Sequence, residues 1–156
     1  MSYESDIYSV DIVTKDLEQI SDEVGAERSP SISPNGKMIA YSFEERRPLA
    51  YSPNQVAIMD INGNNKRIIS KGLDGDADNL QWSDDNRSIF FSYDQRGIRK
   101  IGQLMLNGEI KNITNGLGGT TLGRPYLSGS YHHSAQNIAF TYGGGNRPAD
   151  VAVLMN

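Results

Sequence analysis

The sequence predicts an all-β fold: a partial β-propeller of about three four-stranded antiparallel blades in an open ring. Three observations support this prediction: a repeat of about 50 residues, two hairpin patterns within each repeat, and no long helical period. Ile39, Ile89 and Ile138 occupy equivalent positions, 50 and then 49 residues apart. A β-sandwich, the alternative fold, also accommodates many short strands but gives no reason for this spacing.

The N-terminal unit, residues 1–27, reads as the end of a blade. Residues 6–12 match the third strand of the later repeats and residues 17–21 match the fourth. Residues 16–24 carry the only ambiguous pattern, which we interpret as a turn and a strand. We therefore expect the first half of this blade, and the native N-terminus, to precede the chain.

The first full blade is predicted over residues 28–76. Its first hairpin, residues 31–42, turns at Ser-Pro-Asn-Gly (residues 33–36), a sequence rich in residues that tolerate tight turns. Its second hairpin joins residues 55–61 to residues 66–70 through an Asn-Gly turn, which is a strong hairpin signal.

The second blade is predicted over residues 77–122 and an incomplete blade over residues 123–156. Hairpins are expected at residues 81–92, with a Ser-Asp-Asp-Asn turn, and around Asn107-Gly108. The last unit has one hairpin at 131–141 and a third strand at 150–155, which gives thirteen strands in all. Because a closed ring needs at least about four blades, we expect the open blade edges to promote self-association.

The composition limits the chemistry and the partners of the chain. Its 156 residues are 37% hydrophobic and 22% charged, contain no cysteine and carry a net charge of −4. Disulfides, thiolate catalysis and cysteine metal sites are excluded, and a nucleic-acid or anionic-membrane partner is disfavoured. No apolar run approaches the ~18 residues of a spanning helix. The polar N-terminus is not a signal peptide. The compartment stays open, with the cytoplasm favoured over the periplasm.

Residues 29–41 resemble the WD40-like repeat of TolB-type propellers and of the N-terminal propellers of the prolyl oligopeptidase (S9) family of serine peptidases. The stretch from Arg124 to Val151, which includes Pro125, Tyr126 and Arg147-Pro148, is similar to the acylaminoacyl-peptidase and dipeptidyl-peptidase branch. The turns at residues 83–86 and 133–136 depart from the repeat pattern.

The resemblance implies a division of labour. In this family the propeller sits over a C-terminal α/β-hydrolase domain that carries a Ser-Asp-His triad, and it restricts access to short or unstructured peptides. We therefore expect this chain to be a non-catalytic propeller portion of such an enzyme. Its partner would be the C-terminal α/β-hydrolase domain of the same protein, and peptides would be the substrates of the whole protein. A TolB-like protein–protein interaction module is the alternative. Other propeller enzymes, such as sugar-active ones, form a third class.

We predict no catalytic, cofactor-binding or metal-ligating residue and no cofactor. Ser130 does not fit the Gly-x-Ser-x-Gly nucleophile elbow, because Ser128 stands where the first glycine is required. The glycines at 143–145, followed by Asn146, lack the Lys-Ser/Thr sequence and the helix of a phosphate loop, so they are expected to form a hairpin tip.

Two further groups resemble metal sites. His132 and His133 are adjacent on a predicted strand, where they replace Trp82-Ser83 and should point to opposite faces, one packed and one exposed. Asp74, Asp76 and Asp78 have the spacing of the first ligands of a calcium loop. The later ligand positions hold Asn79 and Asp85 instead of glycine and glutamate, which favours a loop between blades.

The charged run Glu44-Glu45-Arg46-Arg47 is expected in a loop after a second strand, exposed to solvent. In some dipeptidyl peptidases of the family a pair of glutamates in the propeller holds the substrate amino terminus. The helical setting of that pair is missing here, so the role is not transferred. Five aromatic residues are expected to pack between blades, a ligand cage being the alternative: Tyr41, Trp82, Phe90, Phe91 and Phe140.

Overall fold

The computed structural model describes residues 4–46, 51–119, 129–144 and 147–155, whose thirteen strands form four antiparallel sheets. The first sheet is β1 (Tyr8–Val10) and β2 (Leu17–Gln19). The second has the order β3 (Gly25–Ile32), β4 (Met38–Glu45), β5 (Gln55–Asp60), β6 (Arg67–Ile68). The third contains β7 (Ala77–Trp82), β8 (Ser88–Gln95), β9 (Ile98–Met105) and β10 (Ile110–Asn115). The fourth contains β11 (Tyr131–Ser134), β12 (Asn137–Gly144) and β13 (Arg147–Leu154).

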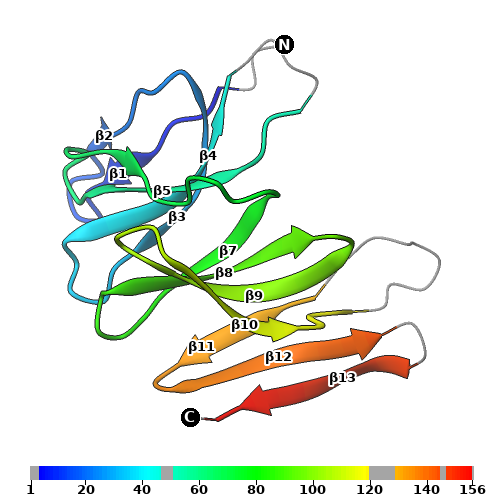
Figure 1. Ribbon diagram of the computed structural model, residues 1–156. Helices are drawn as coiled ribbons and strands as arrows, with labels where there is room; N and C mark the ends of the chain where they lie inside the picture. Colours follow the sequence, from blue (N-terminus) through cyan, green and yellow to red (C-terminus); the bar gives the residue numbers. More distant parts are fainter. Residues whose placement is uncertain (1–3, 47–50, 120–128, 145–146, 156) are drawn as a thin grey trace.

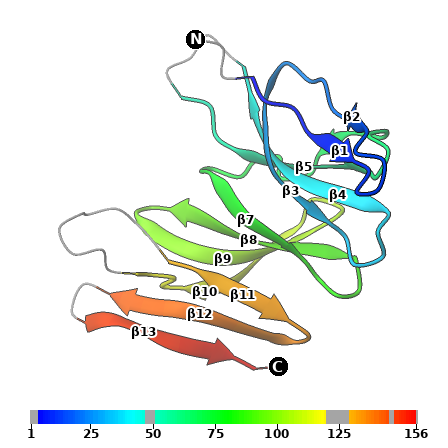
Figure 2. The same cartoon turned by 180° about the vertical axis from the view of Figure 1, so that it is seen from behind.

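The four sheets follow one another in chain order, with the two termini at opposite ends of the stack (Figures 1 and 2). Each four-stranded sheet is a meander of two hairpins, as in a propeller blade. This arrangement confirms the predicted all-β, partial and open propeller, with sheets of two, four, four and three strands. Among the described residues, no helix is long and apolar enough to cross a membrane.

The first hairpin of each full blade is closed by the same side-chain hydrogen bonds. Ser33 Oγ accepts from the backbone N–H of Met38 at 2.9 Å and donates to Asn35 Oδ1 at 2.8 Å. In the next blade Ser83 Oγ accepts from the N–H of Ser88 at 3.0 Å and donates to Asp85 Oδ1 at 2.6 Å. Serine with Asn or Asp two residues later therefore explains why these two different sequences form one turn.

A second repeated contact joins the third strand of a blade to its fourth strand, which are β1 and β2 in the first sheet and β5 and β6 in the second. The backbone N–H of Ile7 donates to Ser21 Oγ at 2.7 Å, and that of Val56 donates to Ser70 Oγ at 2.8 Å. Each pair is followed by a backbone bond, from Ile20 N–H to Ile7 O and from Ile69 N–H to Val56 O. The shared pattern identifies β1 and β2 as the equivalents of β5 and β6, the third and fourth strands of a blade, as the sequence predicts.

The hydrophobic core lies between sheets, in three clusters. The first and second sheets enclose a cluster around Tyr41 and Met59, and the second and third enclose one around Trp82 and Phe91. The third and fourth enclose one around Phe140, with Phe90 and Ile138. Each sheet buries its apolar side chains against its neighbours in the chain, as blades of a propeller do.

Several strands extend beyond their predicted ends. β3 begins at Gly25, three residues before the predicted start of the blade, and β9 begins at Ile98 instead of residue 102. Arg96 and Gly97 both have positive φ, so a two-residue turn closes the β8–β9 hairpin and lets Gln95 pair with Ile98. β13 likewise begins at Arg147 instead of residue 150. The division of the chain at residues 28, 77 and 123 stays a prediction.

Candidate functional site

A groove of about 560 Å³ lies between the third and fourth sheets. Strands β8 to β13 and the turns after β7 and β11 form its walls. The lining residues that determine its chemistry are Ser83, Asp84, Asp85, Phe90, His133 and Gln136.

The floor of the groove is apolar and aromatic. Phe90 and Ile138 are buried there, in the cluster that joins the two sheets. The imidazole of His133 stacks on Phe90, with ring centroids 4.3 Å apart and an interplanar angle of 25°. The floor can therefore accept an apolar or planar group.

The rim of the groove carries negative charge. Asp84 and Asp85 are exposed in the turn between β7 and β8. The Ser83 hydroxyl, followed by the backbone N–H of Arg87, donates to Asp85 and lowers the pKa of its carboxyl. Asp85 therefore stays ionised at neutral pH, and the rim favours a cationic group of a ligand.

Ser83 has the only hydroxyl among the described residues that line the groove, and the turn already uses it. It donates to Asp85 Oδ1 at 2.6 Å and to the Ser88 carbonyl at 3.0 Å. A carboxylate of lowered pKa is a weak base, so this pair is suited to holding a turn and not to activating a nucleophile. The Ser83–Asp85 pair is therefore accounted for by the structure of the turn.

The edges of the third and fourth sheets are held together by hydrogen bonds between β7 and β11. Gln81 Nε2 donates to the Tyr131 carbonyl at 3.0 Å, and Gln81 Oε1 accepts from the His133 N–H at 2.8 Å. The Tyr131 hydroxyl donates to the Asn79 carbonyl, and burial raises the pKa of this phenol. These hydrogen bonds hold the third and fourth sheets, which form the groove, in a fixed relative position.

The two histidines face opposite sides of β11, as the sequence predicts. His132 is exposed and His133 is half-buried against Phe90. His133 pairs with Ile138 as Trp82 pairs with Ile89, so His133 alone occupies the Trp82 position. The shorter turn of this repeat concealed that register in the sequence.

Two of the three aspartates of the calcium-like spacing have protein partners. Asp76 Oδ1 accepts from the backbone N–H of Asn54 at 2.8 Å, and Asp78 Oδ2 lies 3.1 Å from Arg99 Nη2. The described residues include no group of three or more His, Asp or Glu side chains placed to hold a metal ion. Asp76 lies in the connection between the second and third sheets, as the sequence predicts. Asp78 was wrongly placed in that loop, because it belongs to β7 and pairs with Ser92 of β8.

The predicted position of the charged run was partly wrong. Glu44 and Glu45 belong to β4 and not to the following loop, because β4 pairs with β3 as far as Gly25. Glu44 forms an ion pair with Arg28 at 3.1 Å, and Arg46 pairs with Glu4 at 2.6 Å. Arg47 lies outside the described residues.

Other predicted features lie partly outside the described part of the chain. Ser128 and the segment 122–126, which contributes to the family resemblance, are not described, nor are residues 145 and 146 of the glycine-rich turn. Gly143 and Gly144 are the last residues of β12, next to that turn. The predicted packing of Tyr41, Trp82, Phe90, Phe91 and Phe140 between sheets is confirmed.

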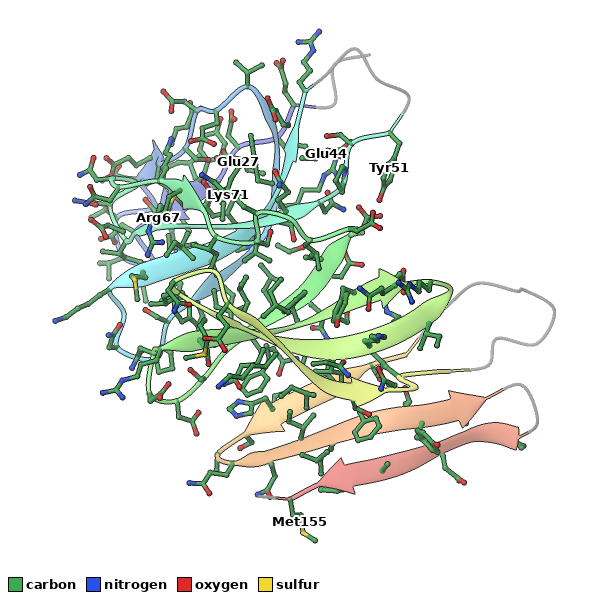
Figure 3. The ribbon with its side chains drawn as sticks, in the orientation of Figure 1. Glu27, Glu44, Tyr51, Arg67, Lys71 and Met155 are labelled. Atoms are coloured by element: carbon green, nitrogen blue, oxygen red, sulfur yellow. The ribbon has the colours of Figure 1, made fainter. Side chains whose placement is uncertain are left out.

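Sequence reasoning missed a buried polar pair at the other end of the molecule (Figure 3, Glu27). Glu27 and the Tyr41 hydroxyl are both buried in the interface of the first two sheets. Burial raises the pKa of Glu27, opposed by the nearby Ser21 hydroxyl and the Lys66 ammonium. No local signal distinguishes Glu27 from an exposed strand glutamate, because its burial depends on residues before it in the chain.

No protein family model matches the chain. Dipeptidyl-peptidase 5 of Porphyromonas gingivalis is 26% identical over 118 residues, which cover 74% of this chain and 17% of that protein. The chain thus spans less than a fifth of the curated relative that it matches.

Among solved structures, TolB from Acinetobacter baumannii has a TM-score of 0.62 and 21% identity, covering 95% of this chain and 34% of TolB. A puromycin-hydrolyzing peptidase of Mycobacterium tuberculosis has a TM-score of 0.55 and 16% identity, covering 92% of this chain and 29% of the peptidase. Oligogalacturonate lyase shares the same architecture, with a TM-score of 0.66, 15% identity, and 92% and 37% of the two chains covered. The resemblance to TolB-type and S9-type propellers is therefore confirmed at the level of the fold.

Proposed function

We propose that this chain is a non-catalytic propeller portion of a serine peptidase related to the dipeptidyl and acylaminoacyl peptidases. Its role is to restrict the access of peptides to a C-terminal α/β-hydrolase domain of the same protein. The observation that supports this proposal is the 26% identity to a dipeptidyl-peptidase over 74% of the chain.

The groove between the third and fourth sheets suits a peptide contact in this role. Its apolar floor accepts a hydrophobic or aromatic side chain, and the Asp84 and Asp85 carboxylates attract an amino group or a basic side chain. Nothing in its chemistry requires a cofactor. The peptide is held by burial and charge, while bond cleavage belongs to the other domain.

The direct test uses the coding sequence that follows this chain in its gene. The proposal expects a Gly-x-Ser-x-Gly elbow, followed by an aspartate and a histidine in that order. The longer protein should hydrolyse dipeptidyl or acyl-aminoacyl chromogenic substrates and should be labelled by a serine-directed inhibitor at the elbow serine. A gene that ends after a few more repeats would overturn the peptidase assignment.

The role of the groove has a separate test in the longer protein. Replacing Asp84 with Asn should raise KM severalfold for peptides with basic residues and leave kcat unchanged, because the rim charge contributes only to binding. Asp16→Asn is the matched control, since Asp16 is exposed in the distant turn between β1 and β2. Equal KM values for wild type and Asp84→Asn would separate the groove from peptide recognition.

A TolB-like interaction module is the second candidate function. The observation that favours it is the likeness to TolB over 95% of the chain. In that case the gene would encode further repeats and no hydrolase domain, and the groove would contact a segment of another protein. The same gene sequence therefore distinguishes the two functions.

A further inference from the structure

A pocket of about 360 Å³ lies on the face of the second sheet that packs against the first, near the edge strand β6. Its described wall residues all belong to the second sheet or to the segments that flank it: Glu23, Tyr41, Ala57, Lys66, Arg67, Ile68 and Lys71. The pocket is therefore formed by a middle part of the chain, away from both of its ends.

A tyrosine in the wall of this pocket replaces the phenylalanine of the other sheets. Tyr41 follows the repeat isoleucine of β4 by two residues, and Phe91 and Phe140 follow those of β8 and β12 in the same way. All three rings are buried between sheets. Packing between sheets thus requires the aromatic ring, and the hydroxyl is an addition found in the second sheet.

A lysine in the wall likewise replaces an apolar side chain. Arg67 pairs with β5 at the position where Lys111 pairs with β9. Lys66, one residue earlier, therefore corresponds to Ile110, which packs against the apolar cluster between the second and third sheets. The Lys66 side chain is only 17% exposed. A charged group is thus held where the next blade places a hydrocarbon side chain, an arrangement that needs polar partners.

The Lys66 ammonium balances the acids around it. Its Nζ lies 2.8 Å from Asp22 Oδ1, and it also interacts with the carboxyl groups of Glu23 and Glu27. Glu27 is itself a polar replacement, because its register in β3 is that of Ala77 in β7. Polar residues at positions that are apolar in the next blade therefore gather at this one interface.

Two further cations of the wall are left without an acid. Arg67 lies in β6 and Lys71 lies just after it (Figure 3). Arg67 Nη1 donates to the Leu106 carbonyl at 3.0 Å, and neither cation forms an ion pair with an acid in the described part of the chain. Glu23 is the one acid among the described wall residues. The wall therefore carries an excess of positive charge.

The Tyr41 hydroxyl also lacks a partner. Tyr41 is fully buried, and its hydroxyl has no hydrogen-bond partner among the described residues. Burial, followed by the Glu23 and Glu27 carboxyl groups, raises the pKa of this phenol, so the hydroxyl stays protonated and can donate. Buried hydroxyls are normally paired, so a donor without an acceptor in the wall of a pocket indicates a bound group that supplies one.

We propose that this pocket binds an oxyanion, the carboxylate or phosphate group of a small molecule, between the Arg67 guanidinium, the Lys71 ammonium and the Tyr41 hydroxyl. A guanidinium presents parallel N–H donors that match the oxygens of either group, and the ammonium adds a point charge. The site lies at a different interface from the groove between the third and fourth sheets. It is therefore independent of the peptidase assignment.

The test is a titration of the ¹⁵N-labelled 156-residue chain, followed by amide chemical shifts. Inorganic phosphate and succinate are the two probes, each exchanged for chloride at constant ionic strength. The amide signals of Ile68 and Lys71 should shift to saturation with at least one probe. Saturation by phosphate alone assigns a phosphate group, by succinate alone a carboxylate, and by both a site for either oxyanion.

Three variants locate the site. Tyr41→Phe and Lys71→Gln should each weaken binding about tenfold, because each removes one donor to a charged acceptor. Tyr41→Phe introduces the residue of the equivalent positions, and Lys71 is exposed, so both variants should fold, which circular dichroism verifies. Lys111→Gln is the matched control: it removes the cation of β10 that corresponds to Arg67 and should leave binding unchanged.

Two results would overturn the proposal. One is a set of shifts that does not saturate with either probe. The other is an affinity of Tyr41→Phe or of Lys71→Gln equal to that of the wild type, because the hydroxyl or the ammonium would then not contact the anion.

Discussion

At the scale of single residues, Ile89 is the best example of a side chain whose burial follows from the repeat. It lies in β8 with none of its surface exposed, in the cluster between the second and third sheets. Ile39 and Ile138, its repeat equivalents, are also buried. The repeat therefore marks a core position in three sheets.

Replacing Ile89 with Asp should unfold the chain or reduce its stability by about 3–5 kcal/mol, because it leaves an unpaired charge in an apolar cluster. Thermal or urea unfolding followed by circular dichroism measures the loss. Ile98→Asp is the control, since Ile98 is 46% exposed at the start of β9. An unchanged melt for Ile89→Asp would mean that the strand register is shifted by one residue.

The buried Glu27 carboxyl makes the stability of the folded chain fall as pH rises. A carboxylate in an ion pair has the opposite effect. Burial raises its pKa in the folded chain, with smaller opposing contributions from Ser21 and Lys66 and supporting ones from Glu23 and Asp6. The folded state therefore binds a proton more tightly than the unfolded state. The resulting stabilisation is complete below the unfolded pKa and is lost as pH rises through the folded pKa.

Glu27→Gln should therefore be more stable than wild type at neutral pH, by an amount on the order of 1 kcal/mol. The difference should shrink as pH falls towards 4.5, the ordinary pKa of a glutamate. Urea unfolding at several pH values measures it, with Glu18→Gln as the control because Glu18 is exposed on β2. A variant that is less stable than wild type at pH 7 would mean that Ser21 and Lys66 stabilise the Glu27 carboxylate by more than burial destabilises it.

At the scale of elements, two serine hydroxyls bind the start of the third strand of a blade to the end of its fourth strand. Ser70 does so for β5 and β6, and Ser21 for β1 and β2. Ser70 is fully buried and accepts the N–H of Val56, which the ladder leaves without another partner at that end of β5. β6 has only two residues, so this contact supplements a short ladder. Ser21 does the same for β1 and β2.

Ser70→Ala should cost about 1–3 kcal/mol, because a buried backbone N–H loses its acceptor. Ser21→Ala should have a similar effect on the packing of the first sheet. Ser9→Ala, at an exposed position of β1, is the control and should change stability little. Hydrogen exchange at the Val56 amide gives a local measurement, and unchanged protection in Ser70→Ala would contradict the proposed role of the hydroxyl.

At the scale of the whole molecule, the described sheets form an open series with a groove between the third and the fourth. Ser83 in the groove is engaged by Asp85 and the Ser88 carbonyl, and the His133 ring is stacked on Phe90. These contacts fit the proposed function, in which the groove contacts a peptide and bond cleavage takes place in another domain.

The isolated chain should hydrolyse neither acyl-aminoacyl nor dipeptidyl chromogenic substrates, because Ser83, the one serine among the described lining residues of the groove, lies beside a carboxylate that is a weak base. Incubation with a serine-directed inhibitor and mass spectrometry provides the sensitive measurement. Stoichiometric labelling of the pure chain would contradict the prediction. A denatured sample of the same preparation is the control for non-specific modification.

Much of the fold could be predicted from the sequence, because the signals are local. Turn chemistry at residues 33–36 and 62–63 marked the hairpins, and the repeat-equivalent apolar positions of Ile39 and Ile89 marked the second strand of each blade. Strand ends were less accurate, since the tight turn at Arg96 and Gly97 has no such strong signal. The candidate groove could not be predicted, because its walls come from residues that are about 50 positions apart.

The sequence by itself determined the repeat and the hairpins, since these depend on turn residues and on neighbours one or two positions away. Only the tertiary structure decided that Glu27 is buried and that His133 stacks on Phe90. The physical reason is that strand alternation states which face a side chain occupies. Whether that face is covered depends on the sheet packed against it, which comes from a different part of the chain.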